Sequence, residues 1–129
     1  MINFVLKKHK VEKAFFAENK EYERKNNVEI GVEGSVLVPK EIKDNNYAMI
    51  QLKFHVGKPD ERLYLALDTV STFEINEYDT KTKINEDIVR KKCIPIALTE
   101  LRKTVKNVTE AYGLPALELP PFEDEIVNE

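Results

Sequence analysis

Residues 47–56 read Tyr-Ala-Met-Ile-Gln-Leu-Lys-Phe-His-Val, and the rest of the architecture follows from this segment. Apolar and polar residues alternate along it, in the order Ile50, Gln51, Leu52, Lys53, Phe54, His55 and Val56. Successive side chains of a strand point to opposite faces, so this alternation is typical of a β-strand that is buried on one side. Residues 47–56 therefore predict a strand in a sheet with one buried face and one solvated face.

Two neighbouring segments, 28–38 and 62–76, show the same period of two. The first ends at Pro39, and the second follows a short connection at 57–60 that suits a hairpin. Their alternating apolar residues are Val28, Ile30, Val32, Val36 and Val38, and then Leu63, Leu65, Leu67, Phe73 and Ile75. Together with residues 47–56, these segments predict a meander of three antiparallel strands.

A fourth strand is expected at residues 2–18, where Ile2, Phe4 and Leu6 precede a charged stretch and the pair Phe15-Phe16. The alternation slips around Val11, as it does where a β-bulge inserts an extra residue. Residues 19–27 contain almost no apolar side chain except Tyr22 and predict a solvated crossing loop.

After the last strand the period changes to steps of three and four residues, which is typical of an amphipathic helix. The apolar stripe of this predicted helix, residues 87–112, consists of Ile94, Leu98, Leu101, Val105, Val108 and Tyr112. Pro95 lacks a backbone N–H and is expected in the first turn of a regular helix, while Gly113 supplies the C-terminal stop.

The remaining residues, 113–129, form a proline-rich segment that is predicted to be extended. Within it, 114–122 carries Leu, Pro and Phe residues in a stretch too rich in proline for regular strand pairing. This segment either caps the sheet or helix, burying Leu117 and Leu119, or docks another polypeptide, and the two roles are compatible.

These elements predict a single α+β domain over residues 1–129: a four-stranded antiparallel sheet with one long C-terminal helix packed on one face. One helix covers little of a four-stranded sheet, so we expect apolar surface to remain open. A second copy of the chain is the simplest cover for that surface. The sequence therefore predicts a homo-oligomer.

Composition narrows the class of protein further. The formal net charge is −3, whereas nucleic-acid-binding domains usually carry a basic patch, so no nucleic-acid partner is expected. The single cysteine, Cys93, cannot form an intramolecular disulfide, which fits a reducing compartment. The first residues lack the pattern of a signal peptide, and no apolar run approaches the roughly 20 residues that span a bilayer. We expect a cytoplasmic protein without membrane insertion.

The sequence offers no residues for catalysis. His9, His55 and Cys93 are predicted in different elements without a zinc-binding spacing, so no metal site is expected. His55 falls on the polar side of its strand, where a solvated imidazole is expected, and Cys93 between apolar neighbours is expected to be packing material. No glycine-rich loop cradles a phosphate and no carboxylate pair stands out. We predict that the protein is not an enzyme and holds no cofactor.

The order of four strands, a long helix and a proline-punctuated tail resembles the SecB chaperones. In that family the helix carries a cysteine near its start and an arginine nine residues on, matched here by Cys93 and Arg102. The pattern after the family's helix resembles Gly113, Leu114, Pro115, Leu117, Leu119 and Pro120. Upstream, residues 28–32 and 65–68 resemble the family's second and fourth strands.

This resemblance implies a bacterial homotetramer, built as a pair of dimers, that acts as a passive holdase. Such proteins bind extended, non-native polypeptides without nucleotide and deliver them for export through the SecA translocase motor. By the resemblance and by exposure, we predict polypeptide contacts at Tyr22, Tyr47, Leu114, Leu117 and Phe122. A translocase contact is predicted at Asp68, which matches an acidic residue of the family's SecA-binding face.

A second interpretation of the resemblance stays open. Where the family adds another helix after the tail, this chain offers only residues 123–129. That difference favours a SecB-like partner of one specific protein, for example an antitoxin, or a scaffold protein. The range of clients that the protein binds distinguishes the two interpretations.

Overall fold

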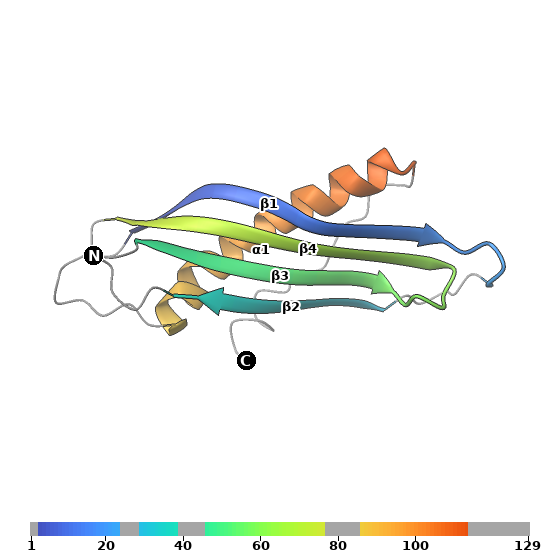
Figure 1. Ribbon diagram of the computed structural model, residues 1–129, viewed down its shortest axis with the longest axis horizontal. Coiled ribbons are helices and arrows are strands. Elements are labelled where there is room, and N and C mark those ends of the chain that lie inside the picture. Colours follow the sequence, from blue (N-terminus) through green and yellow to red (C-terminus); the bar gives the residue numbers. More distant parts are fainter. Residues whose placement is uncertain (1–2, 24–28, 39–45, 77–85, 114–129) are drawn as a thin grey trace.

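The computed structural model describes residues 3–23, 29–38, 46–76 and 86–113. They form strands β1 (Asn3–Glu18), β2 (Ile30–Leu37), β3 (Tyr47–Gly57) and β4 (Leu63–Asn76), followed by helix α1 (Glu86–Ala111). The strands make one antiparallel sheet in the order β1-β4-β3-β2, and α1 crosses one face of it diagonally (Figure 1). The predicted α+β arrangement, with one long helix on one face of the sheet, is confirmed.

The meander is confirmed for β2, β3 and β4, which pair with one another in chain order. Strand β1 instead pairs with β4 and forms the opposite edge of the sheet from β2. The chain between β1 and β2 therefore connects the two outer edges, as expected of a crossing segment.

The core lies between α1 and the two central strands. Every second residue of β3 and β4 is buried, and the helix contributes its stripe from the other side. The largest buried side chains include Leu52, Phe54, Leu67, Phe73, Leu98 and Leu101. Burial of an apolar side chain of this size contributes about 1.5–3 kcal/mol. The period of two in β3 therefore places one complete row of apolar side chains in the core.

Two register shifts in β1 account for its irregular sequence pattern. One lies between Leu6 and Lys8 and the other between Val11 and Lys13, so Lys7 and Glu12 are each an extra residue opposite β4. The predicted bulge near Val11 is confirmed, and a further bulge precedes it. Both bulges reset the alternation so that apolar residues of β1 return to the helix-covered face.

The position expected for Pro95 is wrong. The helix begins at Glu86, so Pro95 lies in its interior. A proline there removes one helical hydrogen bond and costs roughly 3 kcal/mol in an isolated helix. The turns on both sides of Pro95 are buried against the sheet, through Val89 and Cys93 before it and Leu98 after it. Their burial outweighs the local cost.

The end of α1 agrees with the sequence pattern. Gly113 has a φ of 80°, a left-handed conformation that glycine adopts without steric cost, and its N–H donates to the carbonyl of Glu110. Tyr112, just before it, stacks on Phe16 of β1 with the ring centroids 4.5 Å apart. Helix α1, the sole helix in the described ranges, has 26 residues but is too polar to cross a membrane.

Candidate polypeptide-binding surface

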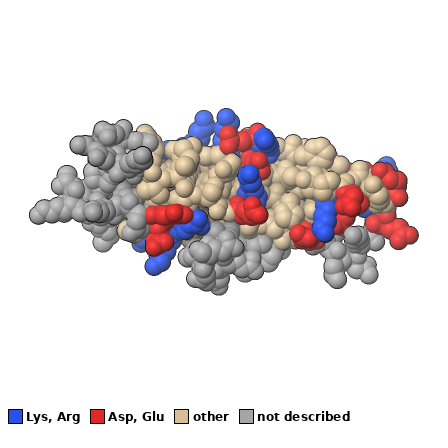
Figure 2. Space-filling model, turned by 60° about the horizontal axis from the view of Figure 1, so that its bottom comes forward, with Lys and Arg blue, Asp and Glu red and all other residues tan. Residues whose placement is uncertain are grey.

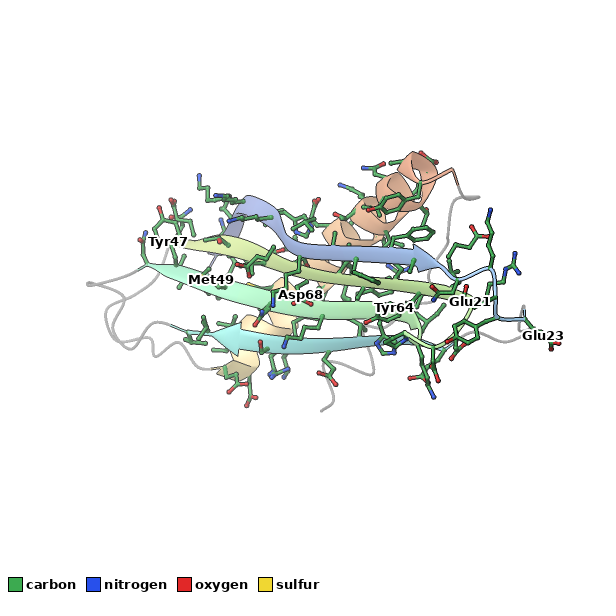
Figure 3. The ribbon with its side chains drawn as sticks, turned by 45° about the vertical axis from the view of Figure 1, so that its right-hand side comes forward. Glu21, Glu23, Tyr47, Met49, Tyr64 and Asp68 are labelled. Atoms are coloured by element: carbon green, nitrogen blue, oxygen red, sulfur yellow. The ribbon has the colours of Figure 1, made fainter. Side chains whose placement is uncertain are left out.

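The face of the sheet that points away from α1, here called the outer face, carries side chains of all four strands. On it, side chains from neighbouring strands form rows that run across the sheet. Tyr47 and Met49 lie toward one end of this face, Asp68 near its middle and Tyr64 toward the other end (Figure 3). Three zones with different chemistry follow one another along the strands.

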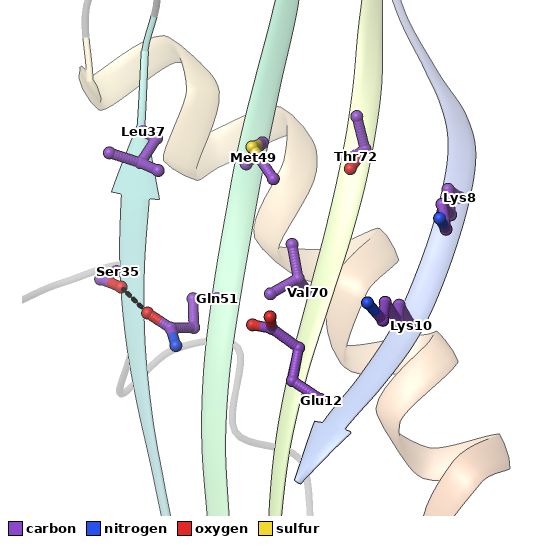
Figure 4. A pocket seen from close by; sticks show the side chains of 9 residues that line it. All are labelled: Lys8, Lys10, Glu12, Ser35, Leu37, Met49, Gln51, Val70 and Thr72. Atoms are coloured by element: carbon purple, nitrogen blue, oxygen red, sulfur yellow. Dashed lines mark hydrogen bonds between the residues drawn. The ribbon is translucent and has the colours of Figure 1, made fainter.

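The first zone is a hollow of about 350 Å³. Two rows line it: Leu37, Met49, Thr72 and Lys8, and then Ser35, Gln51, Val70 and Lys10, with Glu12 beside the second row (Figure 4). The apolar residues Leu37, Met49 and Val70 lie on β2, β3 and β4. The two lysines lie on β1, at the opposite edge of the sheet from Leu37. The hollow therefore has an apolar end and a cationic end.

The second zone is a row of four charged residues with alternating sign: Glu33, Lys53, Asp68 and Lys13. Neighbouring residues in such a row are opposite each other on paired strands, where opposite charges are favourable by a few tenths of a kcal/mol. Charged side chains also gather near the middle of the molecule in Figure 2, with uncharged surface on either side. This row separates the hollow from the third zone.

The third zone is aromatic. Phe15 of β1 is 55% exposed, and its ring centroid lies 5.5 Å from that of Tyr64 on β4. A tilted pair at this distance is favourable, and more than half of the Phe15 side chain still remains exposed. At the same end, the His55 ring lies over Gly31, where a Cβ atom would collide with it, and its Nε2 is 3.2 Å from Glu29 Oε1.

The two tyrosines predicted to contact a polypeptide, Tyr22 and Tyr47, lie far apart in the structure. Tyr47 begins β3 opposite Glu74, whereas Tyr22 follows β1, and its carbonyl accepts a hydrogen bond from Arg62 just before β4. The eleven residues of β4 between those positions span roughly 36 Å. Each tyrosine is 42% exposed, so both can contact a ligand, but only one that extends along the whole sheet.

Asp68 lies on the outer face between Lys13 and Lys53, and a translocase contact there stays a prediction. Lysines and acidic residues alternate around it, so this face is of mixed charge. The other three predicted contact residues, Leu114, Leu117 and Phe122, lie outside the residues that the structure describes.

Sequence reasoning missed the hollow, although the sequence contains its signal. Leu37 and Met49 are apolar residues at positions where the period of two places side chains on the solvated face. Leu37 is 69% exposed, and such a residue contributes nothing to the core. The pattern that predicts such a site is a pair of apolar residues on the solvated sides of two adjacent strands, directly opposite each other.

Two histidines have different surroundings. His9 lies on the helix-covered side of β1, where its Nδ1 is 2.9 Å from Ser71 Oγ and its Nε2 is 3.0 Å from Thr104 Oγ1. Burial lowers the pKa of His9, and the nearby Glu100 carboxylate opposes that effect. His55 is on the outer face and its side chain is 40% exposed, as expected of a solvated imidazole.

Cys93 is fully buried against the sheet, and burial raises the pKa of its thiol to about 12. A thiol with such a pKa carries almost no thiolate at neutral pH and is a poor nucleophile. The expectation that Cys93 is packing material is confirmed. Among the described residues, no group of three or more His, Cys, Asp or Glu side chains is arranged to hold a metal ion.

Comparison with known proteins identifies the fold. No protein-family model and no curated protein matches the sequence. Among solved structures, the chain is similar to the Mycobacterium tuberculosis Rv1957 SecB-like chaperone in complex with a ChAD peptide from the Rv1956 HigA1 antitoxin. The TM-score is 0.68 at 13% identity, with 91% of this chain and 86% of that chain covered.

A protein of unknown function from Streptococcus agalactiae is also similar, with a TM-score of 0.46, 16% identity and coverage of 94% of this chain and 99% of the other. The first likeness, together with the sheet order and the long helix, shows that the chain has a SecB-like fold. The fold expected from the sequence is confirmed.

Proposed function

We propose that this chain, which has the fold of a SecB-like chaperone, is a holdase that binds non-native polypeptides in an extended form. The observation that supports this function most is the match over 91% of the chain to a SecB-like chaperone, whose solved structure holds a peptide from another protein. Binding of this kind makes and breaks no covalent bond, so the proposal includes no catalytic residue and no cofactor.

The outer face has the features that extended segments need. Its exposed apolar groups, Leu37, Met49, Tyr47 and Phe15, are spread along the sheet and are not gathered in one deep pocket. An extended segment offers alternate side chains to such a surface, and shallow apolar contacts accept many sequences. Polypeptide contacts at Tyr22, Tyr47, Leu114, Leu117 and Phe122 remain part of the proposal.

Aggregation assays test this function directly. A model client such as reduced, denatured lysozyme is diluted into buffer with and without the protein, and light scattering follows its aggregation. We expect suppression at stoichiometric ratios without added nucleotide, and co-elution of client and protein on a size column. A protein that neither slows aggregation nor co-elutes with any unfolded client is not a holdase.

A second candidate is a SecB-like partner of one specific protein, for example an antitoxin, or a scaffold protein. It is supported by the similar structure from Mycobacterium tuberculosis, in which the SecB-like chaperone is bound to an antitoxin peptide. Binding that saturates with one natural partner and ignores denatured model proteins would favour this candidate. The two functions therefore give opposite results in the aggregation assay.

Three finer features belong to the proposal. We expect a homo-oligomer, a dimer or a tetramer, which light scattering on a size column measures. We also expect a cytoplasmic location in a bacterium. A role in export, with Asp68 in contact with a SecA motor, predicts that Asp68→Asn weakens co-precipitation with SecA while leaving aggregation suppression intact.

A further inference from the structure

The hollow on the outer face is electrostatically asymmetric, because its lysines lie on one rim and its apolar residues on the other. Lys8 and Lys10 lie side by side on its β1 rim, and neither forms an ion pair with a described residue. Glu12 is the one acidic residue of the lining, so the hollow carries a net charge of about +1, whereas the chain as a whole carries −3. An unpaired cationic rim on an acidic protein favours an anionic group.

The opposite rim has different chemistry. Leu37 is the most exposed large apolar residue among those described, and Met49 beside it is 37% exposed. Methionine is flexible and adapts to apolar groups of different shape. An apolar side chain placed between Leu37 and Met49 would cover both, and Val70 of the neighbouring row also lines the hollow (Figure 4).

The sheet geometry fixes the separation of the two rims. From β2 to β1 the hollow crosses three inter-strand spacings, roughly 14 Å. An extended chain rises about 3.3 Å per residue, and residues four apart point to the same side about 13 Å from each other. An apolar residue and a carboxylate in an i, i+4 relationship therefore match the two rims, whereas an i, i+3 pair points to opposite sides.

We propose that this hollow binds an extended polypeptide segment in which a large apolar residue is followed, or preceded, four residues along by Asp or Glu. The apolar side chain contacts Leu37 and Met49, and the carboxylate lies between the ammonium groups of Lys8 and Lys10. The Glu12 carboxylate, near the middle of the hollow, disfavours a second acidic residue there. This inference rests on the proposed function, because it names the class of segment that the protein selects.

Peptide binding tests the inference with three fluorescein-labelled twelve-residue probes, of which the first two have the same composition. In the first, Leu and Glu stand at positions i and i+4. In the second, they stand at i and i+3. In the third, Lys replaces Glu at position i+4. Fluorescence anisotropy is measured with the full chain at low and high salt. We expect the first probe to bind roughly fivefold more tightly than the other two, and this preference to fade at high salt.

Variants locate the contacts. Lys8→Glu combined with Lys10→Glu should reverse the preference between the acidic and the basic probe. The matched control, Lys91→Glu combined with Lys106→Glu, makes the same change of charge on exposed positions of α1 and should leave the preference unchanged. Leu37→Ser should weaken binding of every probe, and Ile96→Ser, at an exposed apolar position of α1, should not.

The outcomes separate the two proposals. A protein that suppresses client aggregation but binds the three probes equally, or keeps its preference in the double lysine variant, overturns this inference alone. A protein that binds the first probe selectively but holds no unfolded client retains the site and loses the holdase function. A change of oligomeric state in the hollow variants, without a change in probe binding, would identify a second copy of the chain as the occupant and overturn the inference.

Discussion

The Nε2 atom of His9 lies 3.0 Å from the Oγ1 atom of Thr104, so an edge strand of the sheet is tied to the long helix by one imidazole. Thr104 Oγ1 already donates its proton to the carbonyl of Glu100. It must therefore accept a proton from His9 Nε2, which leaves Nδ1 to accept from the Ser71 hydroxyl at 2.9 Å. The neutral imidazole satisfies both contacts, whereas in the charged form Nδ1 would donate to Ser71 Oγ instead.

Stability should consequently depend on the charge of His9. Burial lowers the pKa of His9 in the folded state below its ordinary value of 6.5. The unfolded chain then takes up a proton that the folded chain resists, so this contribution to stability is present above pH 6.5 and is lost as the pH falls below it. We expect the free energy of unfolding, measured with urea, to decrease from pH 7.5 to pH 5 less steeply in His9→Gln than in the unmodified protein. Equal slopes would contradict the assigned network.

Thr69 predicts a stabilising substitution. Its hydroxyl is buried on the helix-covered side of β4 and has no hydrogen-bond partner among the described residues. An unsatisfied buried hydroxyl costs about 1–3 kcal/mol, and valine has the same shape without it. We expect Thr69→Val to raise the free energy of unfolding by about 1 kcal/mol.

The matched control for that substitution is Thr109→Val. Thr109 is also buried, but its hydroxyl donates to backbone carbonyls of the preceding helical turn. Its replacement should bring no gain. An increase of the same size in both variants would mean that added apolar volume, and not the unsatisfied hydroxyl of Thr69, accounts for the effect.

Pro95 predicts a second stabilising change. Because it lies inside α1, the carbonyl of Lys91 has no helical N–H to accept from. Pro95→Ala restores that hydrogen bond, and we expect the free energy of unfolding to increase by about 1–2 kcal/mol. Pro59 lies in the exposed connection between β3 and β4, and Pro59→Ala should leave stability unchanged or slightly lower. Urea denaturation should therefore show a gain for Pro95→Ala and no gain for Pro59→Ala, and equal changes would disprove the prediction.

Cys93 should report on opening of the core. With a pKa of about 12 and no exposure, its thiol should react with iodoacetamide at pH 8 only when α1 leaves the sheet. We expect labelling of the native protein to be at least 100-fold slower than labelling in urea, with a rate that follows global unfolding. Fast labelling of the folded protein would show that this end of α1 opens locally.

Periodicity predicted the elements of this fold because each element has one continuous buried face. Ile50, Leu52 and Phe54 are all buried, as their alternation indicates, and α1 begins within one residue of the predicted start. The position of Pro95 was not predictable from the sequence, because the rule that places proline in the first helical turn considers backbone hydrogen bonds alone. Burial of the neighbouring turns against the sheet overrides that rule. The pairing of β1 with β4 depends on contacts far apart in the sequence, which local patterns do not contain.

The candidate site was less predictable for a different reason. Tyr22 and Tyr47 are predicted polypeptide contacts, and both side chains are exposed. Roughly 36 Å of sheet separates them, however. The hollow arises only when Leu37, Met49 and Lys8 are brought into one row by the register of four strands. The register of paired strands cannot be read from the sequence of any one strand. A surface made of one residue from each strand can therefore be identified only in the folded structure.

The two bulges of β1 also determine where the length of this strand can change. Removing Lys7 or Glu12 would erase one bulge and leave Phe4, Leu6 and His9 on their present side. Removing Val5 instead would turn Leu6 outward and direct Lys7 toward the core. Single-residue gaps in an alignment of homologous chains therefore belong opposite Lys7 or Glu12, and a homologue one residue shorter in this strand should have one bulge fewer.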